Sequence, residues 1–158
     1  MTGRSNARNY RKFGDLDPAE ITFGTLMRNA GYRTAIAGKW QLTGSGGLVH
    51  GTGTTPKKCG FEQSCMWAYE RDVTPEEADA YFANFPVGPK RKMSRFWYPG
   101  ILVNEQLQTT TIDDYGPDVF SDFLLDFMQQ HQEEPFFIYY PMVLTHNPFV
   151  PPPGTPGL

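Results

Sequence analysis

Two side chains whose types suit ligand binding or catalysis follow apolar, strand-like runs of the sequence. Lys39 comes directly after the run 32–37 and Gly38, and His146 lies six residues after the run 136–140. In an open α/β sheet, ligands bind beyond the carboxyl ends of the strands. A lysine supplies a fixed positive charge there, and a histidine titrates near neutral pH. We therefore expect Lys39 and His146 to reach the same sheet edge and to serve one site.

Each candidate also has an ordinary structural explanation. A lysine after a strand is most often an exposed loop cation, and a histidine in a loop is more often structural than catalytic. Gln41, two residues after Lys39, is as readily a solvent-exposed amide as a substrate contact. The agreement between two separate helix–strand units is stronger evidence for a functional role than either residue alone.

The first helix–strand unit is predicted over 23–37. Apolar residues recur at the helical spacing, at Phe23, Leu26, Met27 and Ala30. Gly31 is typical of a helix end, and the apolar run 32–37 predicts a strand. Two capping signals compete for the start of the helix, the stretch 17–20 and Thr22.

The second unit is predicted over 117–140. Apolar residues fall on one helical face, at Phe120, Phe123, Leu124, Phe127 and Met128. Burying such side chains contributes roughly 1.5–3 kcal/mol each, so this face needs a sheet to pack against. Pro135 prevents the helix from continuing. The run 136–140, apolar on both faces, is typical of a central strand in a parallel sheet.

The sequence between these units carries weaker signals. The stretch 61–69 suits a short buried strand or a core turn, and 74–82 suits a short capped helix. The stretches 101–105 and 107–112 are able to pair as a hairpin. The aromatic residues 96–98 begin another strand-like stretch; they could line a sugar pocket, although core packing is their default.

Other titratable residues are interpreted as structural. Cys59 and Cys65 allow one disulfide, but free buried thiols agree at least as well with their spacing. His50 and His131 are predicted to lie at the surface. The carboxylates at 113–114 are explained better by a turn or a helix cap than by calcium binding.

The overall composition excludes several classes of function. The 158 residues carry a net charge of −3, so no global field favours nucleic acid or an anionic membrane. The short basic run 90–92 with Arg95 is interpreted as a solvated loop. No apolar stretch approaches the roughly 20 residues of a membrane helix, and the first residues lack the apolar core of a signal peptide. Glycine (16) and proline (14) make up about 19% of the chain, against roughly 12% on average, so the core is thin and suggests an incomplete domain.

Several stretches resemble motifs of the sulfatase family, within the alkaline-phosphatase-like superfamily. Gly31-Tyr32-x-Thr34-x-x-x-Gly38-Lys39-Trp40 resembles the family's second signature, and Met1-Thr2-Gly3-Arg4 resembles the tail of the first. The stretch 135–148 resembles the later strand and loop that bring in an active-site histidine. Cys59-Gly60-Phe61-Glu62 resembles a further, less specific block. The similarity spans nearly the whole chain and is weakest over 72–112.

The resemblance implies an α/β fold, a three-layer alkaline-phosphatase-like sheet with helices on both faces, here incomplete. Residues 1–158 would be part of the N-terminal, catalytic domain, without its first strand, nucleophile motif and C-terminal part. Lys39 would bind a sulfate oxygen and stabilise charge on the leaving oxygen, and His146 would contact the sulfate or the leaving group. Gln41 stands where the family commonly has histidine, and an amide cannot shuttle a proton near neutral pH.

The resemblance also implies a nucleophile and a metal ion. In this family a cysteine or serine is converted to formylglycine, which attacks sulfur, and Ca²⁺ held by acidic residues neutralises the sulfate. This sequence has no C/S-x-P-x-R motif and no Asp-Asn pair after His146, so the formylglycine would lie upstream of Met1 and no metal ligand is assigned. We expect this chain alone to be inactive. The expected ligand is a sulfated small molecule or sugar, and the expected location is periplasmic or secreted.

Two other functions remain as alternatives. The first is a phosphoryl or phosphonate hydrolase of the same superfamily, which the nucleophile region would distinguish from a sulfatase. The second is a non-enzymatic domain that binds sulfated ligands or a partner chain. In either case exposed sheet edges and apolar faces would favour self-association of the fragment.

Overall fold

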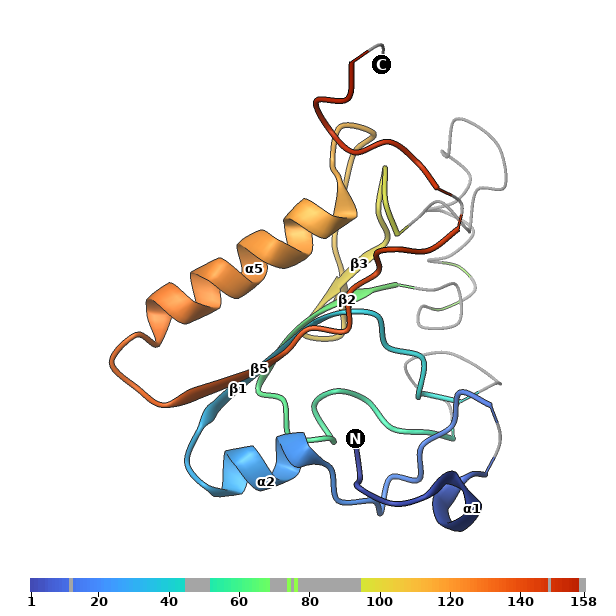
Figure 1. Ribbon diagram of the computed structural model, residues 1–158, viewed down its shortest axis with the longest axis vertical. Coiled ribbons are helices and arrows are strands. Elements are labelled where there is room, and N and C mark those ends of the chain that lie inside the picture. Colours follow the sequence, from blue (N-terminus) through green and yellow to red (C-terminus); the bar gives the residue numbers. More distant parts are fainter. Residues whose placement is uncertain are drawn as a thin grey trace.

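The computed structural model describes residues 1–11, 13–44, 52–68, 74, 76, 95–147 and 149–156, and within them a five-stranded sheet carries helices on both faces (Figure 1). The strands lie in the order β4-β3-β2-β1-β5. In chain order the elements are α1 (Asn6–Asn9), α2 (Phe23–Asn29), β1 (Arg33–Gly38), β2 (Gln63–Trp67), β3 (Ile101–Val103), β4 (Gln106–Leu107), α5 (Gly116–Gln130) and β5 (Phe136–Tyr139).

The central strand β1 is parallel to both of its neighbours. Ala35 pairs with Gln63 of β2 on one side and with Ile138 of β5 on the other. The strands β3 and β4 are antiparallel and form the predicted hairpin, with a second strand of only two residues. Because β1 and β5 are adjacent and parallel, their carboxyl ends meet at the same sheet edge, as the sequence predicts.

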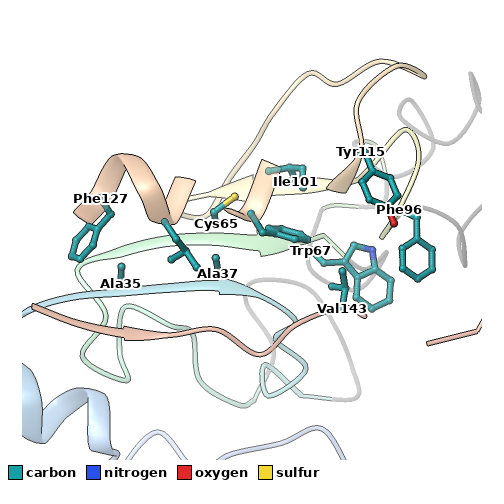
Figure 2. Close-up of a cluster of buried hydrophobic side chains, with 11 residues drawn as sticks. Ala35, Ala37, Cys65, Trp67, Phe96, Ile101, Tyr115, Phe127 and Val143 are labelled. Atoms are coloured by element: carbon teal, nitrogen blue, oxygen red, sulfur yellow. The ribbon is translucent and has the colours of Figure 1, made fainter. Parts of the chain in front are cut away.

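Alternate residues of β1 serve two separate cores. Ile36 packs with Phe61 and Met66 on the side of α2, whereas Ala35 and Ala37 face α5. Figure 2 shows this second core, in which Phe127 of α5 lies over the face that carries Ala35, Ala37 and Cys65. The small alanines let α5 approach β1 closely. The three-layer α/β fold predicted from the sequence is therefore confirmed.

Thr22 is the N-cap of α2, which settles the competition between the two capping signals. The Thr22 hydroxyl accepts a hydrogen bond from the Thr25 amide at 3.3 Å and donates one to the Cys59 carbonyl at 2.7 Å. The Asp17 carboxylate instead accepts a bond from the Ala19 amide within a turn. Gly31 follows the helix with a φ of +87°, as expected of a helix-ending glycine.

The strand β5 differs from its prediction as a central strand. Within the described sheet it is the edge next to β1, and each of its four residues is half-buried. Its aromatic side chains nevertheless pack on α2, with the Phe23 ring 5.7 Å from Phe137 and 5.0 Å from Tyr139. Apolar residues on both faces of a strand indicate that other elements pack above and below it. An edge strand can be packed in this way too, so the pattern does not show whether a strand has hydrogen-bonded neighbours on both sides.

Two basic residues predicted at the surface are buried. His131 is only 8% exposed, because the last turn of α5 packs its ring against Phe127 at 4.7 Å. Arg95 is 7% exposed, and its guanidinium lies 4.4 Å from the centre of the Trp67 ring. A planar guanidinium stacks on an aromatic face, so its charge does not require an exposed position.

Several smaller predictions are confirmed. Cys59 and Cys65 are free and buried. Asp114 closes a turn by accepting hydrogen bonds from the Thr111 amide and hydroxyl. Phe96 packs in the core rather than lining a pocket, although Trp97 forms an isolated bridge with Tyr115 instead of a strand.

Other predictions lie outside the described residues. These are most of the helix at 74–82, the basic run 90–92 and His50. Among the residues described, none of the helices has the length and apolar character needed to cross a membrane.

Candidate functional site

The loop after β1 is tied directly to the loop after β5. The Lys39 amide donates a hydrogen bond to the Pro141 carbonyl at 2.8 Å. Gly38, with a φ of +107°, makes this approach possible, because a Cβ there would overlap the Pro141 carbonyl oxygen. The Lys39 side chain is half-exposed at this edge. The two loops that carry the predicted site residues are thus joined at their first residues.

His146 lies on the exposed part of the second loop. Its ring nitrogen Nδ1 is 2.7 Å from the Asn147 carbonyl oxygen, and both residues are exposed. The surrounding chain also exposes apolar side chains, with Leu144 at 40% and Phe149 at 81%. The structure thus places His146 on a loop that starts beside Lys39. A direct contact between these two side chains stays a prediction.

The segment after Lys39 is held on a rigid support. Trp40 is buried, and its indole N–H donates to the Thr54 carbonyl at 3.0 Å. The Leu42 carbonyl accepts bonds from the amides of Leu16 and Thr54. Gln41 lies between these two anchors and is half-buried. The backbone at Gln41 is therefore held from both sides.

Sequence reasoning missed the two residues that position Lys39. Pro141 supplies the carbonyl that binds the Lys39 amide, and Trp40 anchors the following turn. A tryptophan inside an otherwise polar and glycine-rich stretch was the available signal for an anchor. No pattern in the sequence pointed to Pro141, because its role depends on the pairing of β1 with β5.

An ion-pair network joins the opposite, amino-terminal edge of the same strands. The Arg33 Nε lies 3.0 Å from Glu62, and its Nη1 lies 3.6 Å from Glu134, which is in turn 2.9 Å from His131. The hydrogen bond to Glu62 raises the pKa of Arg33. Burial acts to raise the pKa of Glu62, but bonds from Arg33 and the Thr34 amide hold that pKa below its usual value. The hydrogen bond with His131 lowers the pKa of Glu134. These charges stabilise the strand ends away from the candidate site.

The buried thiols are poor candidates for a nucleophile. Burial raises the pKa of Cys65 to about 12 and also raises the pKa of Cys59. A thiolate, not a thiol, is the reactive form. In the part of the chain that the structure describes, no three His, Cys, Asp or Glu side chains lie close enough to hold a metal ion. The described residues therefore do not fit a calcium site.

Comparison with known proteins identifies the family to which this chain belongs. The Sulfatase family model matches residues 1–157, and the chain belongs to the sulfatase family. The fold is also found in the crystal structure of Ps i-CgsB in complex with k-i-k-neocarrahexaose, with a TM-score of 0.62 at 17% identity. That match covers 93% of this chain and 33% of the Ps i-CgsB chain.

Three curated relatives share this sequence region. The uncharacterized sulfatase YidJ of Escherichia coli (strain K12) is 30% identical over 83% of this chain and 24% of its own length. The N-acetylgalactosamine-6-sulfatase of Mus musculus is 26% identical over 93% of this chain and 27% of its own length. Arylsulfatase A of Bos taurus is 27% identical over 99% of this chain and 32% of its own length. The chain thus spans between a quarter and a third of the length of these relatives.

Proposed function

We propose that this chain contributes the sulfate-binding edge of an enzyme that hydrolyses sulfate esters of carbohydrates or aryl alcohols. The observation that carries the proposal is the hydrogen bond between the Lys39 amide and the Pro141 carbonyl, because it joins the loop after β1 to the loop after β5. Family membership supports the reaction class. The names of the mouse and bovine relatives, an N-acetylgalactosamine-6-sulfatase and an arylsulfatase, support the two substrate classes.

Lys39 would act as the fixed cation of this edge. Its backbone is held on both sides, by Pro141 through its own amide and by the buried Trp40 that follows it. An ammonium whose position is fixed before the reaction stabilises negative charge without reorganisation, and removing such a group typically costs a hundredfold or more in rate. In this role Lys39 would bind a sulfate oxygen and stabilise the oxygen that leaves.

His146 and Gln41 would also contact the ester in this proposal. His146 lies on the exposed loop after Pro141, where an imidazole is able to meet the sulfate or the leaving group. Gln41 can donate and accept hydrogen bonds but cannot carry a proton. The Gln41 amide is therefore suited to binding the ester and not to proton transfer. The presence of Gln41 at this position also favours the alternative, a non-enzymatic domain that binds sulfated ligands.

The chain by itself should bind sulfate esters without turning them over. Its sequence has no C/S-x-P-x-R motif from which formylglycine is made, and its described residues do not assemble a calcium site. The proposal for the enzyme as a whole includes a periplasmic or secreted location, which rests on family membership alone.

The test is binding and turnover of a chromogenic aryl sulfate by the purified chain. We expect saturable binding of 4-nitrocatechol sulfate, weaker binding of unsulfated 4-nitrocatechol, and no hydrolysis with calcium present. Lys39→Met should abolish the preference for the sulfated compound. Lys58→Met is the matched control, because Lys58 is an exposed lysine that lies outside this edge.

The outcomes separate the alternatives. Equal binding of the sulfated and unsulfated compounds would contradict a sulfate site at Lys39. An equal loss of sulfate preference in Lys39→Met and Lys58→Met would contradict it as well. Hydrolysis that disappears in Lys39→Met would show that the chain alone is active. A stronger preference for 4-nitrophenyl phosphate than for the sulfate would favour a phosphoryl hydrolase.

A further inference from the structure

The loop that carries His146 is attached to the core of the fold at both of its ends. At its start, Val143 is 3% exposed and packs in the core that α5 covers (Figure 2). At its end, Val150 packs against the same core. The stretch 144–149, which is the His146 loop, therefore lies between two fixed points of the chain.

The described residues of the His146 loop are exposed. Leu144 is 40% exposed, Phe149 is 81% exposed, and the stretch 145–147 is exposed as well. The His146 ring nitrogen Nδ1 lies 2.7 Å from the carbonyl oxygen of its neighbour Asn147. This contact stays within the loop and does not tie the ring to the sheet. The position of His146 at the sheet edge is therefore set by the anchors at the two ends of its loop.

Trp97 supplies a hydrogen bond at the second of these anchors. Its indole N–H donates to the carbonyl of Pro151, the residue after Val150, at 3.0 Å. Trp97 and Pro151 are 54 residues apart, so the bond joins two distant parts of the chain. An indole N–H only donates, and a backbone carbonyl is a suitable partner for it. Trp97 thus fixes the far end of the His146 loop.

The side chain of Trp97 is held at the start of α5. Its ring lies 5.0 Å from the ring of Tyr115, the buried N-cap residue of that helix. Next to this pair, the Gly116 amide donates to the Phe96 carbonyl at 2.6 Å. A donor that is already restricted loses little freedom when it binds its acceptor. The bond to Pro151 is therefore made from a support that does not move with the loop.

The second anchor matters because a chain held at one end samples more positions than a loop held at both ends. A side chain that is restricted before its ligand binds loses less freedom on binding, so the ligand is bound more tightly. Release of the far end would leave Val143 in the core and would let His146 move. The contribution of His146 to binding would then fall.

From this arrangement we propose that Trp97 is a positioning residue for His146. It binds the Pro151 carbonyl, holds the far end of the His146 loop, and so keeps the imidazole in place for an ester at Lys39. Trp97 acts through the loop and has no assigned contact with the ester. The inference rests on the proposed function, and it adds to that site a residue that lies almost 50 positions before His146 in the chain.

The first measurement follows the mobility of His146 without any ligand. The chain has three histidines, so selective ¹⁵N labelling gives three backbone signals, and His146→Gln identifies the one that belongs to His146. Trp97→Phe removes the N–H donor and keeps an aromatic ring, so it should fold as the original chain does. We expect the heteronuclear NOE of the His146 amide to fall in this variant. The NOE of His131, at the end of α5, should stay unchanged, whereas a general loosening of the fold would lower both.

Two further variants make the result specific. Thr155→Val removes a hydroxyl that donates to the Pro152 carbonyl at 2.7 Å. This bond lies beyond the second anchor, so its loss should leave the NOE of His146 unchanged. Trp97→His is the rescue variant, because the imidazole Nε2 stands in the same place relative to Cγ as the indole Nε1. At about pH 8, where an ordinary imidazole is neutral, its N–H should restore the NOE of His146.

The second measurement is the affinity of the same variants for 4-nitrocatechol sulfate. Trp97→Phe should weaken binding by about 2- to 10-fold, as for one lost hydrogen bond, and Thr155→Val should not weaken it. Failure of the proposed function is seen separately, as a sulfate preference that persists in Lys39→Met.

Three outcomes would overturn the proposal. The first is an unchanged NOE of His146 in Trp97→Phe, and the second is a Trp97→His variant as mobile as Trp97→Phe. The third is a mobile loop with unchanged affinity for the sulfate, in a chain whose sulfate preference is lost in Lys39→Met.

Discussion

The contact between Gly38 and Pro141 gives the sharpest prediction, because the chain contains a matched control for it. Gly38 and Gly31 flank the same strand, and both have a left-handed φ, at +107° and +87°. A Cβ on Gly31 would meet no atom within 4 Å, whereas a Cβ on Gly38 would overlap the Pro141 carbonyl. Alanine is therefore strained by the backbone at both positions, and only at Gly38 does it also meet a steric clash.

The expected magnitudes follow from these contacts. An L-residue with left-handed backbone costs roughly 1–2 kcal/mol, which applies to both variants. Gly38→Ala also loses the hydrogen bond from Lys39 to Pro141, worth roughly 0.5–1.5 kcal/mol, and overpacks the junction at a cost of roughly 1–3 kcal/mol. Replacing glycine by alanine also lowers the conformational entropy of the unfolded chain, which favours folding. This contribution is similar in both variants, so it cancels in the comparison. Gly38→Ala should thus be less stable than Gly31→Ala by about 1.5–4.5 kcal/mol.

The assay is urea unfolding of the purified chain at low protein concentration, followed by tryptophan fluorescence. Because Gly38 precedes Lys39, the same variant should also weaken the preference for 4-nitrocatechol sulfate, and Gly31→Ala should leave that preference intact. Equal stabilities of the two variants would refute the idea that Pro141 holds Lys39 in place. Loss of sulfate preference in Gly31→Ala would show that the measured effect is general loosening of β1.

Three further predictions test other parts of the fold. Thr22→Val should lower the free energy of unfolding by roughly 1–2 kcal/mol, because the helix cap and the hydrogen bond to the Cys59 carbonyl are both lost. The control is Asp17→Ala, which removes the competing cap residue. It should change the free energy of unfolding by less than about 0.5 kcal/mol. The pKa of Glu62 is lowered on folding from its usual 4.5, so its contribution to stability is present above that pH and is lost as the pH falls further. Glu62→Gln should weaken the dependence of the free energy of unfolding on pH below 4.5, and the control Glu133→Gln should not. An unchanged pH dependence in Glu62→Gln would contradict a stabilising ion pair between Glu62 and Arg33. Finally, the edge of β5, which is open in the described sheet, and exposed apolar residues such as Leu26 and Phe149 should make the chain self-associate or bind a hydrophobic dye. A chain that sediments as a monomer, binds no dye and melts cooperatively would contradict this prediction.

Local patterns in the sequence were sufficient to predict the main elements. The spacing of Phe23, Leu26 and Met27 predicts α2, and the apolar face of the stretch 120–128 predicts α5, because a helix buries side chains at a fixed period. The same reasoning places Lys39 after one strand and His146 after another. The family motifs around Lys39 were equally readable, since they consist of neighbouring residues.

The sequence could not assign the environment of single polar residues. His131 and Arg95 have charges typical of a surface, yet both are buried. The His131 ring lies against Phe127 of its own helix, and the Arg95 guanidinium lies over Trp67, which is 28 residues earlier in the chain. The edge position of β5 is a further example. Apolar residues on both of its faces report the helices above and below it, and they carry no information about hydrogen-bonded neighbours on either side.

What the sequence by itself determined about this protein is therefore the helices α2 and α5, the strands β1 and β5, the family, and the two candidate residues that follow those strands. The tertiary structure alone decided that β1 pairs with β5, that the Pro141 carbonyl binds the Lys39 amide, and that residues from the first 16 positions line an open cavity together with Leu42. The physical reason is that periodicity and capping act over a few residues. The pairing of β1 with β5 joins segments about a hundred residues apart, and the cavity wall joins the first 16 residues with Leu42. These meetings are set by the packing of the whole fold.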